Sequence, residues 1–237
     1  MGYRNEDEME IKEKLAFTLA EVLITLGVIG VVAAITIPGL ITSYNKKITE
    51  TRLAKFYSVF NQAIRLSVAE NGDVDTWDDY WDNDGIITGG QENQTGVEKA
   101  FDTYLRPYMQ IAYKKRIHYG QDKILYVLPD GGAFAYNVWG TRDITFFPKD
   151  AEKCIARNMP IGTCSFMFIF YPISEAESWK YHYNKGIEPY LYDWDGSEAH
   201  LKSGATYSCA NSGYYCTAMI KNNGWKIPKD YPLKLQY

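Results

Sequence analysis

The sequence predicts an α+β fold, in which a long N-terminal helix packs on a small antiparallel β-sheet head. Two patterns in the 237-residue chain predict this fold. An apolar stretch near the amino terminus continues into a stretch with a single apolar stripe at helical spacing, which indicates one long helix. Later segments are short, rich in apolar and aromatic residues, and separated by turns that contain Gly and Pro, which is typical of strands.

The apolar stretch is long enough to cross a membrane. Residues 22–45 contain no charged side chain, and nearly all of residues 22–37 are apolar. A helix needs about 20 apolar residues to span a bilayer. Glu21 is the only charge in residues 15–45. Because an ionised carboxylate in such a helix is costly without a partner, we expect Glu21 to have a specific role.

A cleaved secretory signal is the alternative interpretation of this stretch. Such a signal has an apolar core of about 7–15 residues followed by small residues at the cleavage site. Residues 32–34, Val-Ala-Ala, fit that description, and an exported enzyme would then begin at Ile35. Two features favour a retained helix. Glu21 interrupts the apolar core near its start, and apolar residues continue past residue 34 as far as Ile41.

The residues around Glu21 resemble a known processing signal. Residues 16–24, AFTLAEVLI, look like the cleavage and methylation motif of type IV pilins and of the related pseudopilins of type II secretion. The resemblance is strong over about residues 14–60. In that family a membrane peptidase cuts on the cytoplasmic side of the apolar segment, and the new amino terminus is methylated. The resemblance therefore implies cleavage between Ala16 and Phe17.

The resemblance also implies roles for two residues of the helix. Glu21 becomes the fifth residue of the mature chain (21 − 16), where the family pairs this carboxylate with the amino group of Phe17 on a neighbouring copy. An opposite charge is the direct remedy for a buried carboxylate, so this pair favours a stack of parallel helices. Near the helix end, Glu21 can also reach the lipid headgroups. Pro38 lies where family members often have a helix-kinking proline.

Two features depart from the family pattern. The residue before the cut is usually Gly, whereas here it is Ala16. The leader carries three basic and five acidic side chains, a net charge of −2, although family leaders are short and basic. Translation from Met9 gives a shorter leader of balanced charge, and we therefore expect Met9 rather than Met1 to be the true start.

These inferences divide the chain into three parts. Residues 1–16 form the leader, residues 17–44 form the apolar helix of a membrane or filament core, and residues 45–237 form the extracytoplasmic head with the amphipathic half of the long helix. The expected location is the bacterial inner membrane before assembly, and an extracytoplasmic or cell-surface filament afterwards. The expected partners are copies of itself, other pilins, and the prepilin peptidase that is also the N-methyltransferase.

The head begins with the amphipathic half of the long helix. Its apolar residues recur at steps of three and four, namely Ile48, Leu53, Phe56, Phe60, Ala63, Ile64 and Ser67 or Val68. Asn71-Gly72 is a helix stop signal. Residues 72–96 are acidic and rich in Gly, which predicts a loop, and a second amphipathic helix is expected over residues 97–108.

Strands are expected after residue 120. Residues 124–128 and 133–139 flank the turn Pro129-Asp130-Gly131-Gly132 and are predicted to form a β-hairpin. Its second strand places Phe134, Tyr136 and Val138 on one face. Residues 165–171, SFMFIFY, are continuously apolar and indicate a buried central strand.

The four cysteines, Cys154, Cys164, Cys209 and Cys216, lie in the last third of the chain. An even number in a domain outside the cytoplasm suggests two disulfides, for which three connectivities are possible. We expect local pairing, Cys154 with Cys164 and Cys209 with Cys216, because each pair brackets a short polar or Pro/Gly-containing segment. A zinc site is the alternative, but Cys-x-x-Cys spacing is lacking.

No cofactor, metal site or catalytic residue is predicted. Residues 82–85 and 193–196 resemble part of a calcium-binding EF-hand loop, but Tyr80 and Leu191 occupy the first ligand positions. Calcium in the head remains an alternative, because pseudopilins can carry it. The three histidines are scattered and no nucleophile-elbow motif occurs, so we do not expect an enzyme. A net charge of −4 gives no basic footprint for nucleic acid.

The sequence therefore predicts a structural subunit, a pilin or pseudopilin of a type IV pilus or type II secretion filament. The alternative is a membrane-anchored or minor subunit whose aromatic head binds a glycan, a surface or an exported substrate. That alternative rests on the 20 Tyr and 6 Trp of the chain. Core packing and subunit interfaces are the more ordinary use of such side chains.

Overall fold

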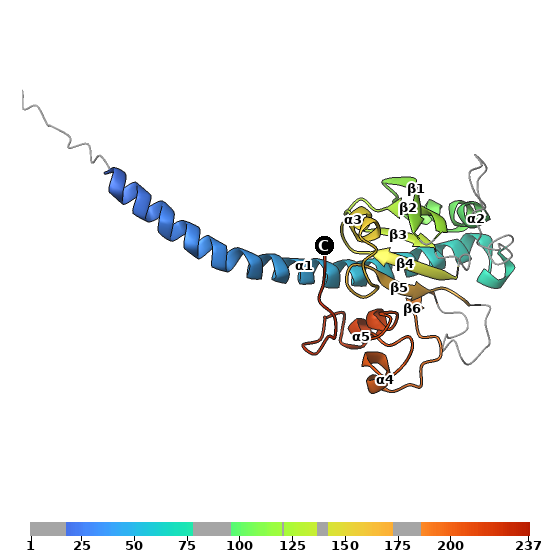
Figure 1. The fold of residues 1–237 in the computed structure, drawn as a ribbon. Coiled ribbons are helices and arrows are strands. Elements are labelled where there is room, and N and C mark those ends of the chain that lie inside the picture. Colours follow the sequence, from blue (N-terminus) through green and yellow to red (C-terminus); the bar gives the residue numbers. More distant parts are fainter. Residues whose placement is uncertain (1–17, 78–95, 120, 137–141, 173–185) are drawn as a thin grey trace, which may run out of the picture. The chain divides into compact units, whose positions relative to one another are not determined.

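The fold is α+β, as the sequence predicts. The computed structural model describes residues 18–77, 96–119, 121–136, 142–172 and 186–237. The chain divides into two compact units, residues 1–42 and 43–237, and helix α1 (Leu19–Asn71) contributes to both. Figure 1 labels the further helices, which are α2 (Gly96–Tyr104), α3 (Ala151–Ala156), α4 (Glu198–Lys202) and α5 (Cys216–Asn222).

The second unit is built on an antiparallel sheet. Each strand pairs with the next one along the chain. The strands are β1 (Tyr113–Tyr119), β2 (Gln121–Val127), β3 (Ala133–Tyr136), β4 (Asp143–Phe147), β5 (Phe166–Ile169) and β6 (Glu188–Pro189). Consecutive antiparallel strands need only short connections, so the sheet assembles from neighbouring segments of chain. The continuously apolar segment predicted as a central strand is β5, and all four of its residues are buried.

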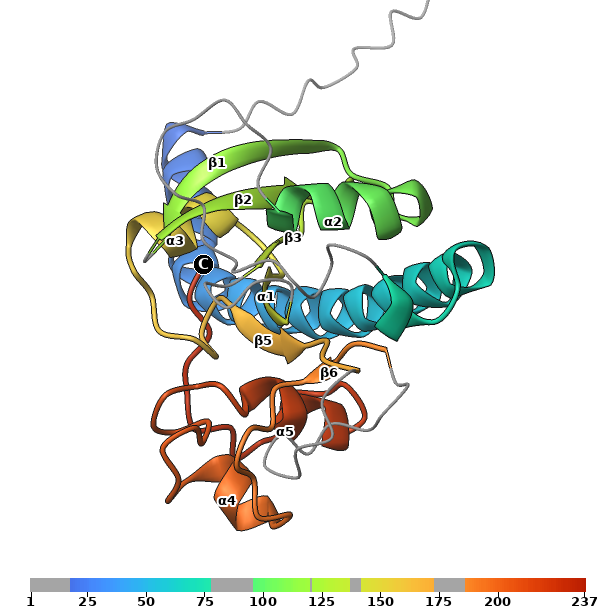
Figure 2. The ribbon, with the colours of Figure 1, turned by 90° about the vertical axis from the view of Figure 1, so that its right-hand side faces the viewer.

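One face of the sheet packs against the amphipathic half of α1. The predicted stripe is confirmed, because Leu53, Phe56 and Phe60 are at most 2% exposed. Phe56 stacks on Phe146 of β4 with ring centroids 4.2 Å apart. Helix α2 covers the same face through Phe101, whose ring lies 4.3 Å from that of Tyr126. Figure 2 shows α1 running along the sheet. This aromatic layer is the main core of the head.

The opposite face of the sheet is covered by two separate clusters. Near β1 to β4, helix α3 and the Cys154–Cys164 disulfide pack on Leu125 and Phe147. Near β5, helices α4 and α5 pack on Met167 and Ile169. Because alternate residues of a strand point to opposite faces, these buried strands carry apolar residues on both.

The predicted hairpin is confirmed over its described residues. Leu128 N donates to the Gly132 carbonyl oxygen at 2.8 Å, and Gly131 has a φ of +82°, a conformation that glycine adopts without steric cost. The turn also contacts α1, because Arg52 donates to the carbonyl oxygen of Asp130 and Lys55 lies 2.7 Å from the Asp130 carboxylate. Val138, expected on the same face as Phe134, lies outside the described residues.

Strands β1, β4 and β6 were not predicted from the sequence patterns. Strand β1 reads YKKRIHY, with cations on both faces, so it lacks an apolar alternation. The cations have partners in the fold, since Lys114 lies 2.5 Å from Glu98 and Lys115 lies 2.5 Å from Glu152. Charged side chains at a sheet edge also discourage pairing with another chain.

The C-terminal segment returns to α1 just beyond its apolar half. Glu50 is 6% exposed, and its carboxylate accepts a hydrogen bond from the backbone nitrogen of Ile227 at 3.0 Å. The Lys226 ammonium lies 3.2 Å from the same carboxylate. The Tyr237 hydroxyl is hydrogen-bonded to that of Thr49, so the end of the chain lies beside α1 (Figure 1). Residues 226–237 therefore fasten the head to the helix.

Replacing Glu50 tests this attachment. We expect Glu50→Ala to lower the free energy of unfolding by about 1–3 kcal/mol, because the Ile227 N–H is left buried without an acceptor. Thr51→Ala is the matched control, since Thr51 is exposed on the same turn. Denaturant unfolding of the purified chain in detergent measures both, and equal stabilities for the two variants would contradict the role of Glu50.

A second buried charge lies on the other side of the sheet. Lys123 of β2 is 5% exposed, and its ammonium lies 5.1 Å from the centre of the Tyr119 ring. Burial lowers the pKa of Lys123 to about 8, although the charge of Asp143 acts in the opposite direction. The folded state therefore releases this proton more readily than the unfolded chain does.

The sign of the resulting pH dependence follows from linkage. A lysine in an unfolded chain has a pKa of about 10.4, so between that pH and about 8 the unfolded state binds the extra proton. We expect the stability of the wild type relative to Lys123→Met to rise with pH in this window, by up to about 1.4 kcal/mol per pH unit. Below about pH 8, the difference in stability between the wild type and Lys123→Met should be constant. Paired denaturation curves measure this, and a difference independent of pH throughout would contradict it.

Candidate functional site

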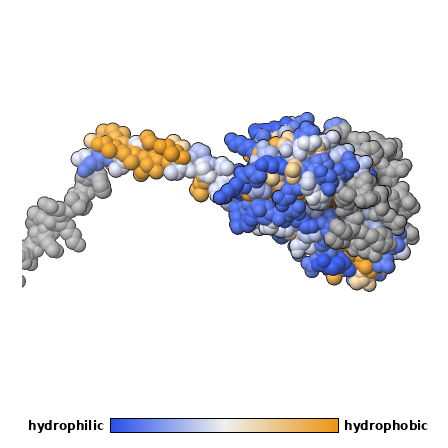
Figure 3. All heavy atoms as spheres, turned by 90° about the horizontal axis from the view of Figure 1, so that it is seen from below, coloured by the Kyte–Doolittle hydropathy of each residue, from blue (hydrophilic) through white to orange (hydrophobic). Residues whose placement is uncertain are grey.

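The first half of α1 presents apolar side chains on all sides. Leu19 is 82% exposed, Ile35 is 75% exposed and Leu40 is 71% exposed. Figure 3 shows this segment as a continuous hydrophobic surface. Its most apolar window has a mean hydropathy of 2.3, with none of it buried, so the helix is long and apolar enough to cross a membrane. A signal sequence passes the same test.

The polar side chains in this segment are satisfied within the helix. The hydroxyls of Thr25, Thr36 and Thr42 donate to the carbonyl oxygens of Val22, Val32 and Pro38 at 2.9–3.0 Å. In hydrocarbon there is no water to replace such bonds, and an unsatisfied polar group is costly. These hydroxyls are therefore compatible with lipid or with a core of packed helices.

Glu21 takes part in a capping box at the start of the helix. Its Oε2 atom accepts hydrogen bonds from the backbone nitrogen and the hydroxyl of Thr18, both at 2.8 Å. Thr18 Oγ1 accepts from the Glu21 backbone nitrogen at 3.3 Å in return. The sequence contains the Thr-x-x-Glu signature of this motif, which the charge pattern alone does not reveal.

The capping box uses one oxygen of the carboxylate. Among the described residues, no group donates a hydrogen bond to Glu21 Oε1. A carboxylate has about four lone-pair sites on two oxygens, so it can keep the cap and also accept a hydrogen bond from a cation. The geometry thus leaves Glu21 able to bind a positively charged partner at the end of the apolar segment.

Of the other residues predicted to act in the apolar helix, the structure describes Pro38 but not Ala16 or Phe17. Pro38 lies inside α1, where its ring removes one backbone hydrogen bond of the helix. The cleavage and methylation residues, Ala16 and Phe17, lie outside the described residues, so their roles stay predictions. Glu21 and Pro38 therefore mark positions along one helix and are not brought together by the fold.

Both disulfides have the predicted local pairing. Cys154 is bonded to Cys164 and Cys209 to Cys216, with Cα atoms 6.0 and 4.5 Å apart. All four thiols are therefore used, and the alternative of a zinc site at these cysteines is excluded. Disulfides persist in oxidising compartments, which favours a location of the head outside the cytoplasm.

The described parts of the chain contain no group of three or more side chains arranged to hold a metal ion. At the second calcium-like segment, Asp195 instead accepts from the Ser197 backbone nitrogen at 2.8 Å and lies 3.1 Å from His200. The first such segment, residues 82–85, lies outside the described residues. Whether the head binds calcium therefore stays open to experiment.

The aromatic side chains serve largely as core. Trp77, Tyr126 and Tyr215 are among the largest fully buried side chains. The Tyr215 hydroxyl donates to the Tyr192 carbonyl oxygen, and burial raises the pKa of Tyr215 to about 12, so the ring stays neutral. Packing therefore accounts for many of the rings on which the ligand-binding alternative relied.

Comparison with known protein families gives a match that covers the head. A family model described as a family of unknown function (DUF6613) matches residues 39–235. Neither the curated proteins nor the solved structures contain a match to the chain. The matched region begins at the end of the apolar segment and includes the whole sheet and both disulfides.

Proposed function

The chain belongs to this family of unknown function, and we propose that it is a structural subunit, a pilin or pseudopilin of a type IV pilus or type II secretion filament. In this proposal a peptidase cleaves before Phe17, the apolar half of α1 holds the subunit in the inner membrane, and the same helix later packs in the filament core. The head remains outside the cytoplasm.

One observation carries the proposal: a single helix changes from apolar on every side to apolar on one side. The side chains of residues 19–42 are almost all exposed, whereas residues 49–67 bury a stripe against the sheet. The fold of one chain thus accounts for the apolar residues in the second half of the helix only. A surface of this size and hydrophobicity requires lipid or other helices around it.

Glu21 supports assembly rather than anchoring alone. A membrane anchor alone uses this carboxylate only for its helix cap, and a charge is costly at membrane depth. In a stack of parallel helices, the amino group freed at Phe17 of one copy supplies a cation for Glu21 of the next. The open Oε1 atom gives this amine an acceptor, and charge-assisted hydrogen bonds are the strong ones.

The proposal predicts the amino terminus of the mature protein. Terminal sequencing or mass spectrometry of the membrane-bound protein should find a methylated Phe17 as its first residue. Phe17→Ala should still leave the chain in the membrane, because the apolar segment is unchanged. A mature chain that starts at Ile35 would show that the segment is a discarded signal, and it would end the structural-subunit interpretation.

The proposal also predicts the effect of removing the carboxylate. Glu21→Ala should insert in the membrane normally and be incorporated into filaments at least tenfold less than the wild type, because the neighbouring amine loses its acceptor. Quantitative immunoblotting of sheared filaments from cells that express both forms measures incorporation.

Thr18→Ala is the matched control for Glu21→Ala. It removes the hydroxyl of the capping box and keeps the carboxylate. If assembly depends on a pair between copies, Thr18→Ala is incorporated nearly as well as the wild type. Equal defects in the two variants would instead assign the role of Glu21 to the cap within its own helix.

A further inference from the structure

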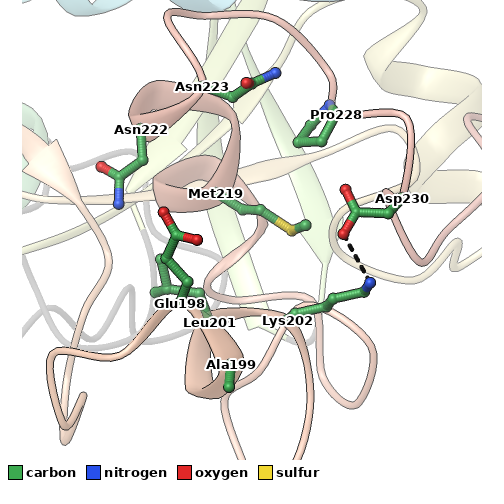
Figure 4. A pocket seen from close by; sticks show the side chains of 9 residues that line it. All are labelled: Glu198, Ala199, Leu201, Lys202, Met219, Asn222, Asn223, Pro228 and Asp230. Atoms are coloured by element: carbon green, nitrogen blue, oxygen red, sulfur yellow. Dashed lines mark hydrogen bonds and ion pairs between the residues drawn. The ribbon is translucent and has the colours of Figure 1, made fainter.

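The head has a hollow beside its last two helices. It lies between α4, α5 and the segment that follows α5, and it has a volume of about 360 Å³. This is within the range of small-molecule sites, about 300–1,000 Å³. Its lining is shown in Figure 4 and consists of Glu198, Ala199, Leu201, Lys202, Met219, Asn222, Asn223, Pro228 and Asp230.

Polar groups stand on two sides of this hollow. On one side Lys202 and Asp230 form an ion pair at 2.7 Å, and the hydrogen bond from Lys202 lowers the pKa of the Asp230 carboxyl. On the other side are Glu198 and Asn222 (Figure 4). The side chains of these two residues make no hydrogen bond or ion pair with any described residue.

The floor of the hollow is apolar. Met219 extends across its middle, between Glu198 and the Lys202–Asp230 pair (Figure 4). Leu201 and Pro228 complete this surface. The lining thus combines an apolar patch with hydrogen-bonding groups at its edges, which is the usual composition of a binding site for a small ligand.

The walls are held in place by the surrounding fold. Helix α5 begins at Cys216, which is bonded to Cys209. The backbone nitrogens of Cys209 and Ala210 donate to the carbonyl oxygens of Leu201 and Lys202 at 2.8 and 2.9 Å, so the disulfide loop also fixes α4. A site on fixed elements loses little conformational entropy when a ligand binds.

The charge pattern selects the chemistry of the ligand. The Lys202 and Asp230 charges cancel, which leaves a single uncompensated carboxylate, Glu198, beside the amide of Asn222. Within this lining a cation would have Glu198 as its one unpaired charged partner, whereas the carboxylates, the ammonium and the amides together can bond to several groups of a neutral ligand. A neutral ligand with several hydroxyls suits this mixture of donors and acceptors, since each hydroxyl both donates and accepts.

We propose that the hollow between α4 and α5 is a binding site for a neutral glycan, with a sugar ring on Met219 and its hydroxyls bonded to Glu198, Asn222 and the Lys202–Asp230 pair. The C–H face of the ring covers the apolar floor. Because the hollow is open to solvent, one copy binds weakly, with a Kd on the order of 1 mM. A filament would repeat the site, and linked sites exceed the affinity of one by about 10²–10⁴.

The methyl group of Met219 provides a direct readout. The full chain, labelled at its methionine methyl groups and held in detergent, is titrated with the methyl glycosides of glucose, galactose, mannose and N-acetylglucosamine. The chain has six methionines, and Met219→Leu assigns the signal of interest. We expect at least one glycoside to shift the Met219 signal in a saturable way while the other methionine signals stay in place.

Single substitutions locate the site. Asn222→Ala and Glu198→Ala should each weaken binding about tenfold, the effect of one hydrogen-bonding side chain. Lys229→Ala is the control, because Lys229 is exposed nearby and does not line the hollow. Unchanged methionine spectra in the absence of glycoside show that the variants are folded.

Three outcomes would overturn the proposal. They are no shift with any of the four glycosides, equal shifts of all methionine signals, and a shift produced by putrescine but by no glycoside, which would make the hollow a site for cations. The titration requires no filament, so its result is independent of whether the chain assembles as proposed above.

Discussion

One helix has to satisfy two different surroundings, and the rest of the structure follows from that constraint. Along its first half the side chains of α1 are almost all exposed, and the hydroxyls of Thr25, Thr36 and Thr42 are satisfied by carbonyl oxygens of the same helix. Along its second half the helix presents one aromatic stripe to a sheet. The change takes place over about residues 42–50, where the two compact units meet in the sequence. The first tertiary contacts of α1 within the second unit therefore lie at the point where the apolar stretch ends.

The first of those contacts involves a buried carboxylate, whose removal from water costs free energy unless it is paired. Glu50 is satisfied by the backbone of Ile227 and by Lys226, and Thr49 is hydrogen-bonded to the last residue of the chain. An unpaired buried charge is strongly destabilising, so α1 packs correctly only when the C-terminal segment is in place. The polar contact therefore gives specificity for one register of helix and head, whereas the aromatic stripe supplies most of the buried apolar area.

Local patterns made much of this fold predictable. The stripe through Leu53, Phe56 and Phe60 repeats at helical spacing, the Pro-Asp-Gly-Gly turn specifies a hairpin, and the cysteines are close enough in sequence for local pairing to be favoured. The parts that escaped prediction depend on contacts between distant segments. Strand β1 is recognisable only once the partners of its cations, Glu98 and Glu152, are known. The role of Glu50 depends on a segment 177 positions away in the sequence. The hollow beside Met219 is likewise formed by three segments that no periodicity connects.

The apolar half of α1 and the head also differ in how specifically each can recognise a partner. Apolar side chains that face lipid or other helices are interchangeable to a large degree, and Glu21 adds one constraint, the position of a cation. In the proposed filament such a helix would bring copies together, and it carries no information on what the filament contacts. The head can carry that information, because its disulfides and backbone bonds fix particular polar groups around a hollow. The family match begins at residue 39, at the end of the apolar segment, and it includes all the residues that line the hollow. Selectivity toward the surroundings is therefore to be sought near α4 and α5, and polymerisation near Glu21.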